Sequence, residues 1–158
     1  MLTSDQEEII ALLIEQETLL QRLYTIFAEK LQNNKDLWLG LAKEEEKHAQ
    51  WLKQLAKATE QGITIFDGAK ITAPSLKVFQ KLLLQTISQA KAGEIDDQRA
   101  LMQAASFERA LIEKNIFTSF TGASAATEKT MELLREETDD HLQQIEAIYA
   151  QDTLDTDK

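Results

Sequence analysis

Residues 37–55 read LWLGLAKEEEKHAQWLKQL and decide the fold. The leucines of this stretch that share one helical face are Leu37, Leu41, Leu52 and Leu55. Their spacing predicts an amphipathic helix with that face in the core, yet the middle of the face carries Glu45 and His48. Burial of an unpaired polar group costs roughly 2–7 kcal/mol, and burial of a charge costs more. The stretch therefore predicts a buried acid and a buried imidazole that need partners.

Composition points to a single all-α domain. The 158 residues suffice for a sizeable core, and only five Gly and one Pro interrupt runs of helix-forming residues. The 27 acidic against 17 basic residues give a net charge of -10, which repels phosphate backbones and anionic lipid surfaces. We therefore expect neither a nucleic-acid partner nor a membrane partner. No signal-like or membrane-spanning segment stands out, so we expect a cytoplasmic protein.

Hydrophobic periodicity divides the chain into five helical segments. They are expected at about 5–31, 37–60, 76–93, 95–120 and 125–150. Ser4 and Glu7 have the spacing of a capping box, and Asp36 is a candidate N-cap for the second segment. Gly and Pro mark residues 61–75 as an irregular connection, which makes the short third segment part of a long crossover.

The end of the chain lacks this periodicity. We expect residues 152–158 to form a disordered acidic tail, which leaves residues 1–151 as one helical domain.

Two further helices also place polar residues on inward faces. The first expected helix carries Glu17 there, and the last carries His141, with Thr138 one turn before it. A shift of the chain by 93 positions superimposes His141 on His48 and Thr138 on Glu45. The same shift superimposes Phe117 on Tyr24 and Phe120 on Phe27. The pattern suggests a pseudo-symmetric bundle in which one half lacks an acid.

Inward acids and histidines at mid-height in a four-helix bundle are typical of carboxylate-bridged metal pairs. Residues at positions i and i+3 lie on one helical face, so Glu45 and His48 could reach the same ion. Carboxylate oxygen and imidazole nitrogen suit iron or manganese, with zinc as a further alternative. The absence of cysteine excludes thiolate metal sites and disulfides.

Four motifs resemble the ferritin-like domain of the rubrerythrin family. They are E-x-x-x-x-R-x-Y at residues 17–24, LAKEEEKHAQWL at 41–52, AASFE at 104–108 and LLREETDDH at 133–141. The resemblance covers about residues 5–150. It implies a ferritin-like four-helix bundle with a long crossover that contains an extra helix. It also implies a non-haem di-iron centre that reduces peroxide or oxygen, an external electron donor and a homodimer. A cysteine-ligated rubredoxin module is excluded by composition.

The resemblance also implies a set of metal ligands. They are Glu17, bridging Glu45, terminal His48, either Glu108 or Glu113 from the third long helix, and His141. Where the family pattern has a Glu three residues before the last histidine, this chain has Thr138. Glu137 could swing in to replace it, since positions i and i+4 also share a face.

An alternative needs no metal. The bundle could be degenerate, with its buried acids and histidines joined in a hydrogen-bonded network and the protein acting as a structural or partner-binding module. Trp38 and Trp51 are interpreted as core or interface aromatics with or without metal. Iron storage is a third alternative, and the sequence leaves open whether the protein is an enzyme.

Overall fold

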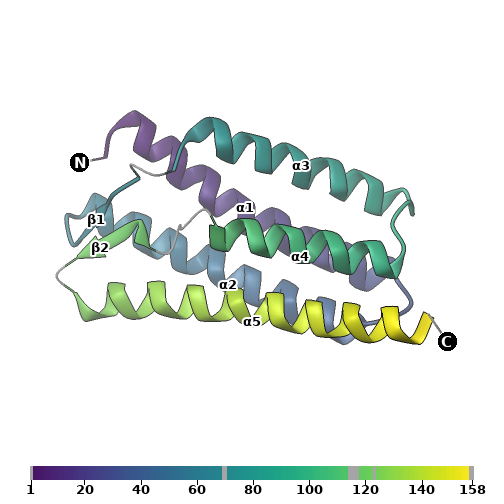
Figure 1. Cartoon of the computed structure of the whole chain (residues 1–158). Helices are drawn as coiled ribbons and strands as arrows, with labels where there is room; N and C mark the ends of the chain where they lie inside the picture. The colour runs from purple at the N-terminus through teal and green to yellow at the C-terminus, as the bar shows by residue number, and fades with distance from the viewer. Residues whose placement is uncertain (1, 69–70, 114–117, 123, 157–158) are drawn as a thin grey trace.

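Five α-helices and one two-stranded sheet make up the described part of the chain in the computed structural model (Figure 1). The described residues are 2–68, 71–113, 118–122 and 124–156. The elements in chain order are α1 (Ser4–Lys30), α2 (Lys35–Glu60), β1 (Thr64–Phe66), α3 (Ala73–Lys91), α4 (Asp97–Glu113), β2 (Phe120–Gly122) and α5 (Ala125–Thr156). The predicted all-α class is confirmed.

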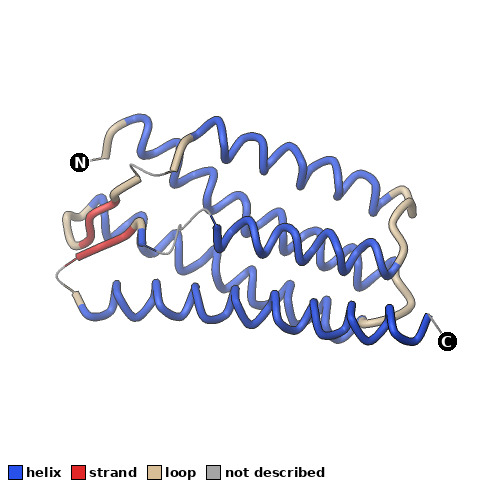
Figure 2. The backbone as a smooth tube through the Cα atoms, in the orientation of Figure 1, coloured by secondary structure: helices blue, strands red, loops and turns tan. Residues whose placement is uncertain are grey.

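The helices form two antiparallel pairs, α1 with α2 and α4 with α5, and α3 packs against α1 (Figure 1). The connection from α2 to α4 runs back along the whole bundle through α3, so α2 and α4 point in the same direction (Figure 2). This is the ferritin-like arrangement with a helical crossover that the sequence predicted. It makes α1, α2, α4 and α5 the four helices of one bundle (Figure 1).

A short antiparallel sheet closes one end of the bundle and was not predicted. Ile65 of β1 lies opposite Thr121 of β2, so the sheet ties the end of α2 to the start of α5. Gly122 permits the close approach, because a Cβ there would lie 3.0 Å from the carbonyl oxygen of Ile63. The predicted helix through residue 120 is wrong, because Phe120 lies in β2; residues 114–117, which follow Glu113 of α4, lie outside the described part. Phe120 pairs instead with Phe66 of β1, more than fifty positions earlier, and local periodicity cannot reveal such a pairing.

Three helix ends also differ from prediction. Thr3 caps α1 and forms the capping box with Gln6, in place of Ser4 with Glu7. The residue before α2 is Asn34 in the left-handed conformation, with φ 65°, so Asp36 lies inside the helix. The last helix α5 continues through Thr156, where a disordered tail was expected from residue 152.

Aromatic packing closes the core beside the buried polar residues. Trp38 is fully buried, its ring 5.6 Å from that of Tyr24 and 4.9 Å from that of Phe27. Such rings bury large apolar areas and fix the relative position of α1 and α2. Trp38 is therefore a core aromatic, as predicted, while Trp51 is half-buried at the edge of the core.

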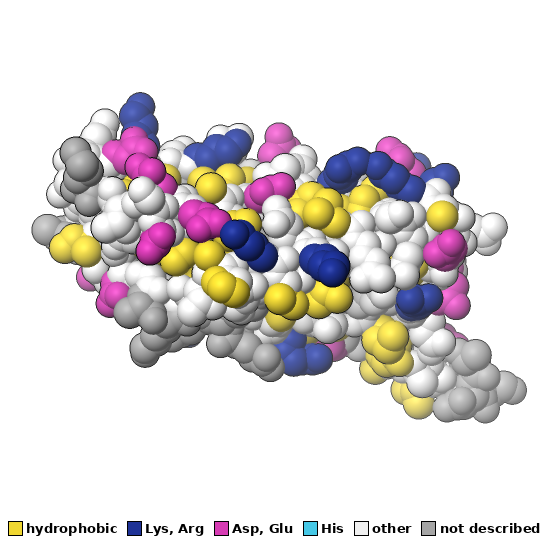
Figure 3. All heavy atoms as spheres, turned by 90° about the horizontal axis from the view of Figure 1, so that it is seen from above, with side chains coloured by type: hydrophobic (Ala, Val, Ile, Leu, Met, Phe, Trp, Pro, Cys, Tyr) yellow, Lys and Arg dark blue, Asp and Glu magenta, His cyan; other side chains and the backbone are white. Residues whose placement is uncertain are grey.

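The outer surface of the crossover helix is mixed in character. Figure 3 looks down on the side of the bundle that α3 covers and shows hydrophobic side chains interspersed with basic and acidic ones. Val78, Leu82 and Leu84 of α3 are about half exposed or more. No described helix is long and apolar enough to cross a membrane.

Candidate metal centre

Four helices each contribute to one buried polar layer. It consists of Glu17 from α1, Glu45 and His48 from α2, Glu108 from α4 and His141 from α5, none more than 2% exposed. Each lies on the core face of its helix among apolar neighbours, so helical periodicity alone directs it inward. The structure thus brings together five of the six residues singled out as metal ligands. The side chain of the sixth, Glu113, lies outside the described part.

The layer divides into two groups that share one carboxylate. Glu17, Glu45 and His48 form the first group, and Glu45, Glu108 and His141 form the second. Within each group one potential ligand atom per residue lies within 4.8 Å of the others. Glu45 Oε2 lies 3.3 Å from His48 Nδ1, and Glu45 Oε1 lies 3.0 Å from His141 Nδ1. The two oxygens of Glu45 therefore face opposite groups, as a bridging carboxylate requires.

The inward atoms of these residues lack hydrogen bonds. Glu17 Oε2, both carboxylate oxygens of Glu45, Glu108 Oε2 and the Nδ1 atoms of both histidines find no hydrogen-bond partner in the described protein. Buried polar atoms are nearly always hydrogen-bonded, and leaving one unsatisfied costs about 1–3 kcal/mol. These oxygen and nitrogen atoms converge, with His141 Nδ1 3.0 Å from Glu45 Oε1, but they are not aligned as hydrogen bonds, an arrangement that fits ligands around a cation.

Both imidazoles are oriented from the other side of the ring by a carboxylate of the partner helix. His48 of α2 contacts Glu137 of α5, with 2.7 Å between His48 Nε2 and Glu137 Oε2. Conversely, His141 Nε2 of α5 contacts Glu44 Oε2 of α2. When an outer carboxylate accepts the Nε2 proton, Nδ1 keeps a free lone pair for a metal ion. The crossed pairs therefore turn both Nδ1 atoms inward.

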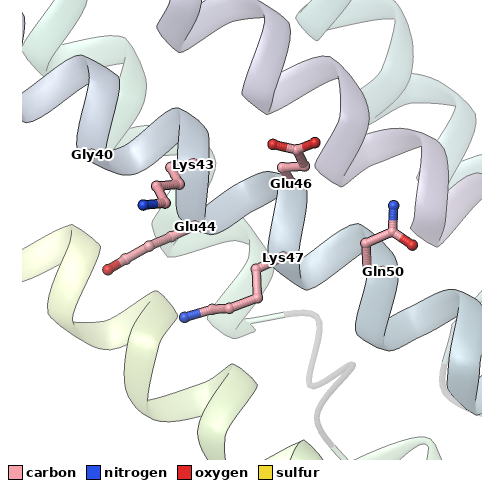
Figure 4. A pocket seen from close by; sticks show the side chains of 6 residues that line it. All are labelled: Gly40, Lys43, Glu44, Glu46, Lys47 and Gln50. Atoms are coloured by element: carbon pink, nitrogen blue, oxygen red, sulfur yellow. The ribbon is translucent and has the colours of Figure 1, made fainter.

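The two outer carboxylates differ in their surroundings. Lys47 Nζ lies 2.7 Å from Glu137 Oε1 and 5.0 Å from the ring centroid of Trp51. Trp51 in turn lies 5.7 Å from the His48 ring. Glu44 borders a surface hollow on the outer side of α2, and Figure 4 shows Glu44 and Lys47 extending toward α5. The carboxylate beside His48 is thus held by Lys47 as well, whereas Glu44, the outer partner of His141, has a side chain that is 41% exposed.

Tyr24 supports the second group from α1. Its hydroxyl donates a hydrogen bond of 2.6 Å to Glu108 Oε1, which leaves Glu108 Oε2 without a partner. Burial raises the pKa of Tyr24 well above its ordinary value, and the neighbouring carboxylates raise it further. The hydroxyl therefore keeps its proton and fixes one oxygen of Glu108.

Burial and mutual proximity shift the pKa values of the layer. Burial raises the pKa of Glu17 well above its ordinary range, and burial with the Glu45 charge raises that of Glu108 to about 7. Burial acts against the charge of Glu45 as well, yet its neighbours Glu17, His141 and His48 lower its pKa. Burial lowers the pKa of an imidazole, but here the nearby carboxylates outweigh the effect of burial. They raise the pKa of His48 and raise the pKa of His141 to about 11. Without metal, the layer holds protons where cations would otherwise sit.

Two predictions about α5 have different outcomes. Thr138 is buried and its hydroxyl donates to the carbonyl of Leu134 at 2.8 Å, so it offers no charged ligand. Glu137 does not swing inward, because its two oxygens contact Lys47 and His48. The repeat holds between α2 and α5 but not at Phe120, which lies in β2 and not in a helix like Phe27 of α1, and residue 117 lies outside the described part.

Sequence reasoning missed the outer partners Glu44 and Lys47. One signal was available, because Glu44 and Glu137 each stand four residues before a histidine and are related by the same shift of 93 positions. What the repeat could not show is that each carboxylate contacts the histidine of the other helix.

Comparisons with known proteins agree with the geometry. The family model described as Rubrerythrin matches residues 8–130. This range contains Glu17, Glu45, His48 and Glu108 and ends before His141. Searches of curated proteins and of solved structures gave no significant match.

Proposed function

This chain belongs to the rubrerythrin family, and from that premise we propose that it is a non-haem di-iron protein that reduces peroxide or oxygen. Two neighbouring groups of carboxylate and imidazole ligands share Glu45, as a paired-metal centre requires. Their oxygen and nitrogen donors suit iron or manganese. The proposal includes the external electron donor, the homodimer and the cytoplasmic location expected from sequence.

One observation carries this proposal. The six inward atoms without hydrogen-bond partners belong to five side chains from four helices, and all five are essentially buried. The atoms approach one another closely, with His141 Nδ1 3.0 Å and His48 Nδ1 3.3 Å from Glu45, but without the alignment of a hydrogen bond. Their convergence without hydrogen bonds supports a centre built for cations.

The residues of the chain hold, orient and isolate this centre. Glu17 and Glu108 would each bind one ion, Glu45 would bind both, and the histidines would bind through Nδ1. Ferrous ions bound there would supply the electrons that reduce an oxygen–oxygen bond, and their open coordination positions would bind the oxidant. Reduction of a peroxide to two waters also consumes two protons, which come from solvent. The apolar wall around the layer excludes bulk water, and the Tyr24 hydroxyl keeps its proton at Glu108 Oε1.

Anaerobic reconstitution with ferrous iron tests the proposal. We expect two ions per chain by elemental analysis, and oxidation of the bound iron by added hydrogen peroxide. Fewer than one ion per chain would contradict a di-iron centre. The matched control is Glu46→Gln, which alters an exposed acid beside Glu45 and is expected to bind iron like the natural chain.

Thr138 favours a second candidate, a degenerate bundle that serves as a structural or partner-binding module. In that case, Glu45→Ala changes the melting temperature equally with and without iron or manganese. A metal-dependent rise in melting temperature that disappears in Glu45→Ala would count decisively against it.

A further inference from the structure

The last helix leaves one position of the centre without a carboxylate. Glu44, Glu45 and His48 of α2 correspond to Glu137, Thr138 and His141 of α5. Thr138 is 2% exposed and lies one turn before His141, on the face that the histidine shares. Its hydroxyl is engaged by the carbonyl of Leu134, so it carries neither charge nor a free proton toward the layer.

No neighbouring acid of α5 fills this position. Both oxygens of Glu137 are engaged, one by Lys47 and one by His48, at 2.7 Å each. The other nearby acids, Glu136, Asp139 and Asp140, are exposed on the outer face of the helix. Within residues 124–156, then, α5 contributes His141 alone as a donor to the centre.

The missing carboxylate leaves charge and coordination incomplete. Two divalent ions bring four positive charges, whereas the inner layer offers the three carboxylates Glu17, Glu45 and Glu108. The charge of Glu137 is balanced by Lys47, and that of Glu44 is screened because its side chain is 41% exposed. Uncompensated charge in a buried layer is costly. Each group also provides three residues, fewer donors than an octahedral ion takes.

We propose that a small exogenous carboxylate occupies the bridging position that Thr138 leaves open. The two oxygens of this carboxylate would contact one ion each, in the same way that the two oxygens of Glu45 face the two groups. Its single negative charge would bring the carboxylate charges to four, equal to the charge of two divalent ions. This inference rests on the proposed di-metal function. It makes the centre dependent on a small carboxylate from solution, with formate the smallest member of the class.

A calorimetric titration of the chelator-treated protein with Co²⁺ tests this inference. The titrations use a non-coordinating buffer and compare sodium formate with the same concentration of sodium chloride. We expect formate to raise the affinity for the second ion at least about tenfold, since even an outer partner of a ligand is worth 10- to 100-fold. The visible absorption of bound Co²⁺ should change in parallel. Acetate and bicarbonate arms then show which members of the class the position accepts.

Two variants identify the position. Thr138→Glu supplies the carboxylate, so it should bind two ions tightly without formate and show no response to it. Thr138→Val keeps the size of the side chain and removes only the hydroxyl, so it should respond like the natural chain. If two ions bind equally in formate and chloride, or if Thr138→Glu still responds, the inference is wrong. If fewer than one ion binds under every condition, the proposed function itself fails.

Discussion

The contributions of α2 and α5 to the centre are alike on the outside and different on the inside. Each helix provides a histidine and, four residues earlier, a carboxylate that contacts the histidine of the other helix. At the position between this carboxylate and the histidine that faces the centre, α2 carries Glu45 and α5 carries Thr138. Each imidazole is therefore oriented by a carboxylate of the other helix, whereas the bridging charge comes from one helix alone. Orientation and charge compensation are separable tasks of such a layer, and substitutions can test each.

The largest effect is expected from Glu45→Gln. It removes the one carboxylate that belongs to both groups, so binding at both positions should fall together. Elemental analysis after iron reconstitution should give less than one ion per chain, and the metal-dependent rise in melting temperature should vanish. Glu46→Gln is the matched control, and retention of two ions by Glu45→Gln would show that Glu45 does not bridge.

Removal of one histidine should separate the two groups. His48→Ala is expected to spare the group of Glu108 and His141. His141→Ala is expected to spare the group of Glu17 and His48. Each variant should therefore bind about one ion per chain. Each truncation also leaves a cavity and an outer carboxylate without its partner, so circular dichroism should first confirm the fold. Loss of both ions in either variant would mean that the two positions form only together.

The outer carboxylates should matter less than the ligands. Glu137→Gln and Glu44→Gln weaken the orientation of His48 and His141, and each should lower metal affinity roughly 10- to 100-fold. The effect of Glu137→Gln should be the larger, because the Glu137 side chain is 23% exposed and also contacts Lys47, while the Glu44 side chain is 41% exposed. Calorimetric titration with Mn²⁺ measures both. The opposite order would indicate that exposure does not govern the strength of these contacts.

The smallest effect concerns pH. In metal-free protein the pKa of His141 is raised from 6.5 to about 11. Its stabilising contribution is therefore complete below pH 6.5 and is lost as pH rises toward 11, by at most about 1.4 kcal/mol per pH unit. Urea unfolding with a chelator should show lower stability at pH 9 than at pH 8, a window above the pKa of about 7 of Glu108. Metal-loaded protein should lose this dependence, because bound imidazoles carry no proton on Nδ1.

Most of the inner layer could be predicted because helical spacing directs side chains. Glu17, Glu45, His48 and His141 interrupt apolar faces of long helices, and a polar residue on such a face must be buried whatever the partner helix is. Glu108, one of the two candidates from the third long helix, also lies in the layer, while the side chain of Glu113 lies outside the described part. The sheet and the end of α4 were missed, because strand pairing depends on contacts between distant segments.

The sequence by itself determined five helical segments and the buried acids and histidines on their inner faces. These follow from a local period of 3.6 residues, which requires no knowledge of neighbours. Only the tertiary structure decided that Glu137 supports His48, that Glu44 supports His141, and that Glu45 turns one oxygen toward each group. Such contacts depend on the register between helices, which side-chain packing sets and the spacing within one helix does not encode.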